Sequence, residues 1–457
     1  MKKLIVGAAL LLGLCLFASA AAADDGAPPN LMPAFDLFYQ TYLYAANDID
    51  FDRTKVMYQP NGQTVGYVLT TIRPGLTWTP ADILTVRYQF EVGDNIWSRN
   101  DVYNDNPNTQ DATVFRQKEI WADLHTPSGS VGTRIGYMYT YDPTHLVLDA
   151  HMGMAQLYFG FGGGKRLTLE AGQLPVDTLE QNSPDSQGAR LQDNTFANQN
   201  YIFAAYATLP LGAAVLSPGV FFNANGWVID RPVNVASAVC NFTYNPAANM
   251  NLNLDGVFQY GKEVHAALDN SDVTLVAGAA QANFSVDWPV VGLRTSALAF
   301  SGGDHNREGR RLDTGFMYSG WSRADTMMMT INWLHDLYTN FDQTVAAEGA
   351  GFALIDQRVS VDVGGDADLF AIVGAGFTMS HADTGNSNYF GTEGQIGVQW
   401  SPLPNHLRLH LIAGGMLPGR AASELINTIN KKAQDPIVQG QAGITVLYGN
   451  VPWFGVK

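Results

Sequence analysis

The chain has 457 residues, with 42 acidic and 26 basic side chains and a formal net charge of −16 at neutral pH. A chain this acidic lacks the concentrated basic surface that nucleic acid requires, so we expect no nucleic-acid partner. The length would suit two or three soluble domains. However, the sequence shows no linker, composition break or fixed-period repeat, and this favours one large domain.

The first 23 residues have the pattern of an export signal. Lys2 and Lys3 precede an apolar run over 4–17, and small residues follow at 18–23. Such a run is too short to span a bilayer and is typical of a cleavable signal peptide. Cys15 follows Leu14, where lipid attachment needs a small residue, so we expect no lipid anchor. We therefore expect a signal peptide at 1–23 and a single barrel domain at 24–457.

The clearest strand pattern lies at 84–93. There apolar residues alternate with polar ones, and the two sets are Leu84, Val86, Tyr88, Phe90 and Val92, against Thr85, Arg87, Gln89, Glu91 and Gly93. Because successive side chains of a strand face opposite sides, one face is apolar and the other polar. In an exported protein this pattern favours a membrane wall around a wet lumen.

The same rhythm recurs along the chain and predicts twenty candidate strands. They lie at 34–46, 65–79, 82–93, 112–125, 131–141, 152–161, 166–174, 200–209, 213–225, 236–246, 250–260, 272–287, 291–301, 313–320, 326–334, 354–363, 368–381, 389–401, 406–416 and 437–449. The connections alternate between short and long, as in barrels with short periplasmic turns and long extracellular loops. The sequence therefore predicts an all-β, transmembrane antiparallel β-barrel.

Several segments interrupt the rhythm. Arg116 and Lys118 share parity with the apolar residues of 112–125, and either a β-bulge or a position of both cations at the membrane interface would explain this. The candidates at 313–320 and 326–334 are weakly patterned, and without them the barrel has 18 strands instead of 20. Residues 302–353 would then form a long connection, which we expect to act as a constriction loop. Residues 422–432 could form a short helix.

Strand parity points seven charged residues into the lumen as candidate pore-lining residues: Arg73, Arg87, Arg134, Arg294, Arg408, Glu91 and Glu393. The physical reason is that a charge facing lipid at the midplane costs a few kcal/mol. Inward arginines could select anions. Alternatively, inward carboxylates such as Glu119, Asp123 and Glu170 could simply balance them.

No cofactor or metal site emerges from the motifs. Asp48, Asp50 and Asp52 have calcium-loop spacing, but Arg53 stands where such a loop needs glycine. The glycines at 162–164 lack the phosphate-loop pattern and are better explained by a tight turn. A rim hydrolase built on Ser301 or His305 is the alternative from the enzyme class. The sequence contains no G-x-S-x-G, so we expect no enzyme.

Short motifs over roughly 250–420 resemble the alginate-export family of outer-membrane barrels. They are Asn253-Leu-Asp-Gly-Val-Phe-Gln-Tyr-Gly-Lys262, Ala280-Gln-Ala-Asn283, Ala299-Phe-Ser-Gly-Gly-Asp304, Gly391-Thr-Glu393 and Met416-Leu-Pro-Gly419. The resemblance implies an 18-stranded barrel that exports a polyanionic polysaccharide. However, Gly136-Tyr137-Met138 stands where the family usually has Gly-Arg-Gln.

These observations together favour a porin-like channel for hydrophilic solutes in the bacterial outer membrane. Export of a polysaccharide is the second hypothesis and a rim hydrolase the third. The expected partners are outer-membrane lipids, lipopolysaccharide and the solute. All strands of such a barrel can pair within one chain, so we expect a monomer.

Overall fold

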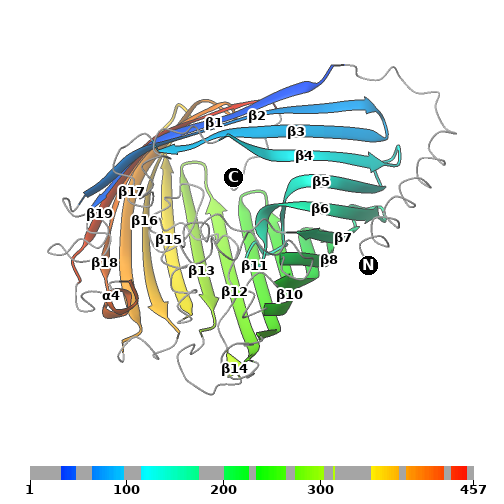
Figure 1. The fold of residues 1–457 in the computed structure, drawn as a ribbon. Coiled ribbons are helices and arrows are strands. Elements are labelled where there is room, and N and C mark those ends of the chain that lie inside the picture. Colours follow the sequence, from blue (N-terminus) through cyan, green and yellow to red (C-terminus); the bar gives the residue numbers. More distant parts are fainter. Residues whose placement is uncertain are drawn as a thin grey trace.

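The computed structural model describes residues 32–47, 64–96, 115–173, 200–225, 233–263, 273–302, 312–313, 351–379, 387–426 and 434–449. In these residues nineteen strands join in one sheet, and all but the two-residue β14 follow one another antiparallel around the barrel in Figure 1. The barrel closes where β1 (Ala34–Asn47) pairs with β19 (Ile437–Tyr448). The predicted antiparallel barrel of 18 strands is confirmed.

The other strands lie close to their predicted positions. In the first half they are β2 (Thr64–Ala81), β3 (Leu84–Ile96), β4 (Phe115–His125), β5 (Val131–Tyr141), β6 (Asp149–Gly160), β7 (Arg166–Gln173), β8 (Asn200–Leu211) and β9 (Ala214–Asn225). In the second half they are β10 (Val233–Ala247), β11 (Met250–Glu263), β12 (Val273–Asp287), β13 (Val291–Phe300), β15 (Phe352–Asp362), β16 (Ala367–Thr378), β17 (Tyr389–Leu403) and β18 (Leu407–Pro418).

Short turns and longer connections alternate around the barrel, as predicted. The short turns include 161–165, where Gly162, Gly163 and Gly164 all have positive φ and Phe161 N donates to Lys165 O at 2.9 Å. Glycine adopts this left-handed backbone without the steric cost of a side chain. The start of β1 and the end of β19 lie side by side, with Leu37 opposite Tyr448, at the short-turn end.

The long connection 301–351 contributes no full strand in its described part. Leu312–Asp313 forms the short β14, which pairs parallel with Thr274 and Leu275 of β12. These two β12 residues lie beyond the pairing with β13, so β14 extends the sheet at the long-loop end (Figure 1). The predicted constriction by 302–353 falls mostly outside the described residues.

The two faces of the wall differ as the alternation predicted. On β3, Arg87, Gln89 and Glu91 are buried on the inner face, whereas Tyr88 is exposed on the outer face. The exposed aromatics near strand ends include Phe35, Trp78, Tyr141, Trp400 and Tyr448. Such residues suit the headgroup boundary of a bilayer.

Aromatic residues near strand ends are expected at the headgroup boundary, but two of them lie inside instead. Tyr44 is fully buried, and its hydroxyl donates to Gln439 Oε1 at 2.8 Å. Trp121 packs against buried apolar residues of the interior. A strand-end position is therefore a weaker guide to an aromatic side chain's environment than its parity.

The predicted bulge in β4 is confirmed. Gln89 lies opposite Glu119 and Phe90 lies opposite Gln117, so Lys118 is the additional residue. A bulge lets two consecutive side chains share a face. Lys118 and Glu119 consequently both reach inner-face partners, which are Glu91 and Arg87.

One helix, α4 (Arg420–Ile426), lies between β18 and β19 in the part of the chain that the structure describes. It begins two residues earlier than the predicted 422–432, and 427–433 fall outside the described residues. No described helix is long and apolar enough to cross a membrane.

Candidate functional site in the barrel lumen

Ion pairs line the inner wall formed by β1 to β5. Glu91 contacts Arg73 at 2.5 Å and Lys118 at 3.3 Å. Arg87 bridges Asp36 at 2.7 Å and Glu119 at 2.5 Å. Each contact joins two strands: three of them link neighbouring strands, and the contact of Arg87 with Asp36 spans from β3 to β1 across β2. Arg73 and Arg87 are therefore each paired with carboxylates, as the charge-balance alternative predicted.

The same arrangement continues on β5. Arg134 Nη2 lies 2.8 Å from Asp123 Oδ2, and its guanidinium lies over the Trp121 ring at 4.3 Å. Tyr158 donates its hydroxyl to the other Asp123 oxygen at 2.8 Å. Both carboxylate oxygens are thus occupied, and the guanidinium is held in a fixed orientation.

Three of these cations are more exposed than their carboxylates, whereas Arg87 is as buried as its partners. The side chains of Arg134, Arg73 and Lys118 are 32%, 20% and 18% exposed, whereas those of Asp123 and Glu91 are 7% and 0% exposed. The carboxylates therefore lie beneath the cations, and this part of the wall presents positive charge to the lumen although the chain is acidic.

A second group of charges lies on the opposite half of the sheet. Arg294 of β13 and Arg358 of β15 are register partners, and Arg358 lies over the Phe370 ring at 4.4 Å. Arg408 shares its face with the buried His410 and Ile412. Glu393 is fully buried and accepts a hydrogen bond from Gln395 Nε2.

All seven residues singled out in the sequence thus lie on the inner face, in two separate groups. That they line a pore stays a prediction. Sequence reasoning did not single out Asp36 or Arg358, although each has inward parity within a predicted strand. Asp36 was missed because it stands alone among apolar neighbours at the start of β1.

A contiguous cluster of buried apolar side chains fills part of the interior. Its strand members come from β5, β6, β8 to β13, β15 and β17 to β19, and none of its buried members comes from β1 to β4. Leu146, Val147 and Leu148 belong to it, as do Ala422 and Leu425 of α4. The β5–β6 connection, 142–148, therefore folds inward, and we call it the inward loop.

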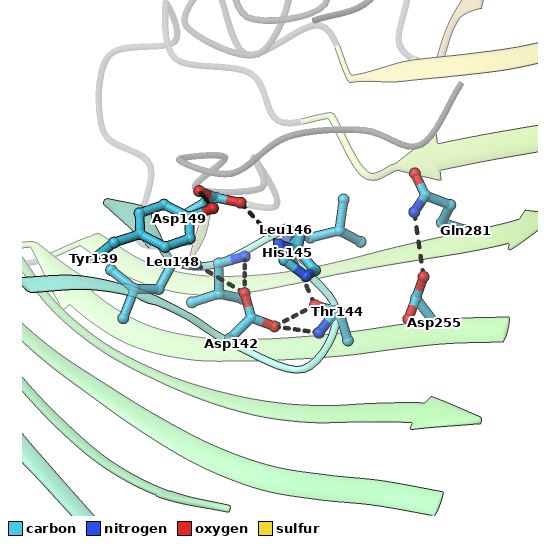
Figure 2. A network of polar contacts seen from close by, with 10 residues as sticks. Tyr139, Asp142, Thr144, His145, Leu146, Leu148, Asp149, Asp255 and Gln281 are labelled. Carbon is cyan, nitrogen blue, oxygen red and sulfur yellow. Dashed lines mark hydrogen bonds and ion pairs between the residues drawn. The ribbon is translucent and has the colours of Figure 1, made fainter. Parts of the chain in front are cut away.

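Asp142 holds the inward loop in shape (Figure 2). Its Oδ1 accepts from the backbone of Val147 and Leu148, both at 2.9 Å. Its Oδ2 accepts from Thr144 N at 2.8 Å and from the Thr144 hydroxyl. Asp142 and Thr144 are fully buried. The sequence signal for this loop was an aspartate followed by a three-residue apolar run directly after a strand.

A second clamp lies beside the loop. Asp149 accepts from the Tyr139 hydroxyl, and its Oδ2 lies 2.8 Å from His145 Nδ1 (Figure 2). The Tyr141 ring stacks on His145 with the centroids 4.2 Å apart. His145 adopts a φ of 61°, so the turn accepts some backbone strain, and these contacts offset it.

Of the two residues proposed for a rim hydrolase, only Ser301 lies in the described part of the chain. Ser301 Oγ accepts from Gly278 N at 3.0 Å and so fixes the end of β13 to β12. His305 and the aspartates at 48, 50 and 52 fall outside the described residues. Among the residues that the structure describes, no cluster of three metal-binding side chains occurs.

The whole architecture is shared with several solved structures. OccAB2 from Acinetobacter baumannii superposes with a TM-score of 0.57 at 9% identity, covering 93% of this chain and 100% of its own. OccK8 (OprE) from Pseudomonas aeruginosa gives 0.56 at 9% identity, with coverages of 93% and 100%. A BenF-like porin from Pseudomonas fluorescens Pf-5 gives 0.53 at 10% identity, with coverages of 92% and 99%.

At such low identities these superpositions establish the shared fold alone. The sequence matches no family model and no curated relative. The resemblance to the alginate-export family is wrong, because the structural neighbours are Occ proteins and a BenF-like porin. The misleading motifs lie on β11 to β13, β17 and β18, where small residues and inward carboxamides recur. These features follow from a barrel wall and are not specific to one family.

Proposed function

We propose that the chain is an outer-membrane channel that passes hydrophilic solutes. The observation that carries this proposal is a closed antiparallel barrel with apolar residues exposed outside and charged residues inside. Closure leaves no strand edge facing lipid, and a polar interior suits a water-filled path. The fold shared with a BenF-like porin supports the same function.

The solute path has charged residues on two parts of the wall. The inner faces of β2 to β5 carry partly exposed Arg73, Lys118 and Arg134, and the second group of charges lies on the inner faces of β13, β17 and β18. Water and ions favour these charged surfaces over the apolar cluster, because an apolar constriction dewets.

The pore-lining role belongs to the charged residues of both groups: Arg73, Arg87, Arg134, Arg294, Arg408, Glu91 and Glu393. Because Arg73, Lys118 and Arg134 are more exposed than their carboxylate partners, we expect a preference for anions.

The cellular setting follows from the same proposal. Residues 1–23 direct export, the short turns face the periplasm and the long connections face outward, toward lipopolysaccharide. The chain acts as a monomer without a cofactor and is not an enzyme.

Ion selectivity in planar bilayers tests the proposal. The folded protein is expected to conduct, with a reversal potential on the anion side in a KCl gradient. R73Q combined with R134Q should move the reversal potential toward cations. The matched control is K165Q, since Lys165 is exposed in a short turn. A folded protein that inserts and does not conduct would rule out the channel.

A further inference from the structure

Five polar side chains form a continuous row across the inner wall, and we call them the lumen row. They are Asn253 (β11), Asn283 (β12), Ser296 (β13), Asp356 (β15) and Glu393 (β17). The strand registers place Asn253 opposite Asn283, Asn283 opposite Ser296, and Ser296 opposite Asp356. Gly374 of β16 lies between Asp356 and Glu393, so no side chain interrupts the row there.

The lumen row is buried, with exposed fractions between 0% and 9%. Despite this, neither Oδ1 nor Nδ2 of Asn283 has a hydrogen-bond partner among the described residues, and the same holds for Ser296 Oγ. Asn253 donates through Nδ2 to Thr243 Oγ1 at 3.0 Å, but its Oδ1 has no partner in this part of the chain. Buried polar atoms are rarely left unpaired, so such a group calls for a ligand or ordered water.

The required ligand chemistry follows from the atoms themselves. Two carboxamide oxygens need donors, the Asn283 amide needs an acceptor, and the Ser296 hydroxyl can do either. A carboxylate supplies acceptors only, and an ammonium group supplies donors only. A hydroxyl group supplies both, so neighbouring hydroxyls of one molecule satisfy the whole set.

We propose that the lumen row binds a neutral polyhydroxylated solute, a polyol or monosaccharide, as it passes through the channel. This inference rests on the proposed function. Asp356 and Glu393 add carboxylates, which accept hydrogen bonds from hydroxyl groups. The unpaired atoms are sealed from solvent in the structure, so binding requires neighbouring inner-face side chains to rotate.

Block of the ionic current by D-glucose and by mannitol tests the inference with the full-length protein in planar bilayers. Each probe is expected to reduce the KCl current of single channels in a saturable manner. S296A and N283A should each raise the half-blocking concentration about tenfold, as expected for one lost hydrogen bond. S285A is the control, because Ser285 lies on the strand and face of Asn283 but outside the row.

The outcomes separate the two proposals. If the wild-type barrel inserts without conducting, the channel itself is wrong. If it conducts and glucose leaves the current unchanged, the lumen row holds water only and the inference fails. The inference also fails if S296A and S285A have the same half-blocking concentration. S296A removes a single oxygen atom, so it keeps the test valid if N283A misfolds. Folding of both variants is checked by the shift in gel migration between heated and unheated samples.

Discussion

At the scale of single residues, Asp142 determines where the inward loop lies. Its carboxylate accepts three backbone hydrogen bonds and one from a hydroxyl, all within 142–148. In D142A the three backbone donors lose their partner in a buried setting, at about 1–3 kcal/mol each. The loop should then leave the apolar cluster, raising single-channel conductance and exposing 142–148 to protease. T144A loses the hydroxyl's bond to Asp142 and a long one from Leu146 N at 3.3 Å but keeps the three backbone bonds to the carboxylate, so it should change both readouts far less. Unchanged conductance and protection in D142A would show that the loop does not narrow the path.

Residue identity and parity predicted which charges turn inward, but not which of them meet. Arg87, for example, was assigned to the inner face from the pattern at 84–93. Its contact with Asp36 requires Asp36 on β1 to lie level with Arg87 on β3. The registers of the β1–β2 and β2–β3 pairs together set this position. The alternation of apolar and polar residues within one strand does not determine its register with a neighbouring strand. The inward loop was missed for a related reason, because a three-residue apolar run carries no periodicity.

At the scale of elements, the bulge at Lys118 decides how β4 presents its charges. A bulge adds one residue to a strand without changing the pairing on either side of it. Deleting Lys118 should therefore keep Gln117 opposite Phe90 and Arg116 opposite Glu91, and should remove only the Lys118 contact with Glu91. Deleting Gln117 instead would place Lys118 opposite Phe90 on the outer face, where a lysine that faces lipid costs up to about 4 kcal/mol, depending on depth. Urea unfolding in lipid vesicles compares the two deletions, and equal stability would mean that the bulge does not decide which residue faces lipid. The phase slip was visible in the sequence, but alternation alone did not decide between a bulge and an interface position of the cations, because only the pairing with β3 identifies the additional residue.

At the scale of the whole molecule, the arrangement depends on the outer face meeting lipid. Ile396 and Gln395 are adjacent in the middle of β17, where Ile396 is 66% exposed and Gln395 is 4% exposed. In I396R a charge would face hydrocarbon near the midplane, and the cost of a lipid-facing arginine there is about 2–4 kcal/mol. Q395R places the same charge on the inner face, among polar groups such as Glu393, so its free energy of unfolding in vesicles should stay within ~1 kcal/mol of the wild type. Unfolding titrations of both variants in vesicles give the comparison. If I396R were as stable as Q395R, the outer face would not contact lipid, and the apolar alternation would need another explanation. A third variant, L403R, tests how the cost depends on depth in the bilayer. Leu403 is exposed at the short-turn end of β17, so an arginine there should cost ~1 kcal/mol or less.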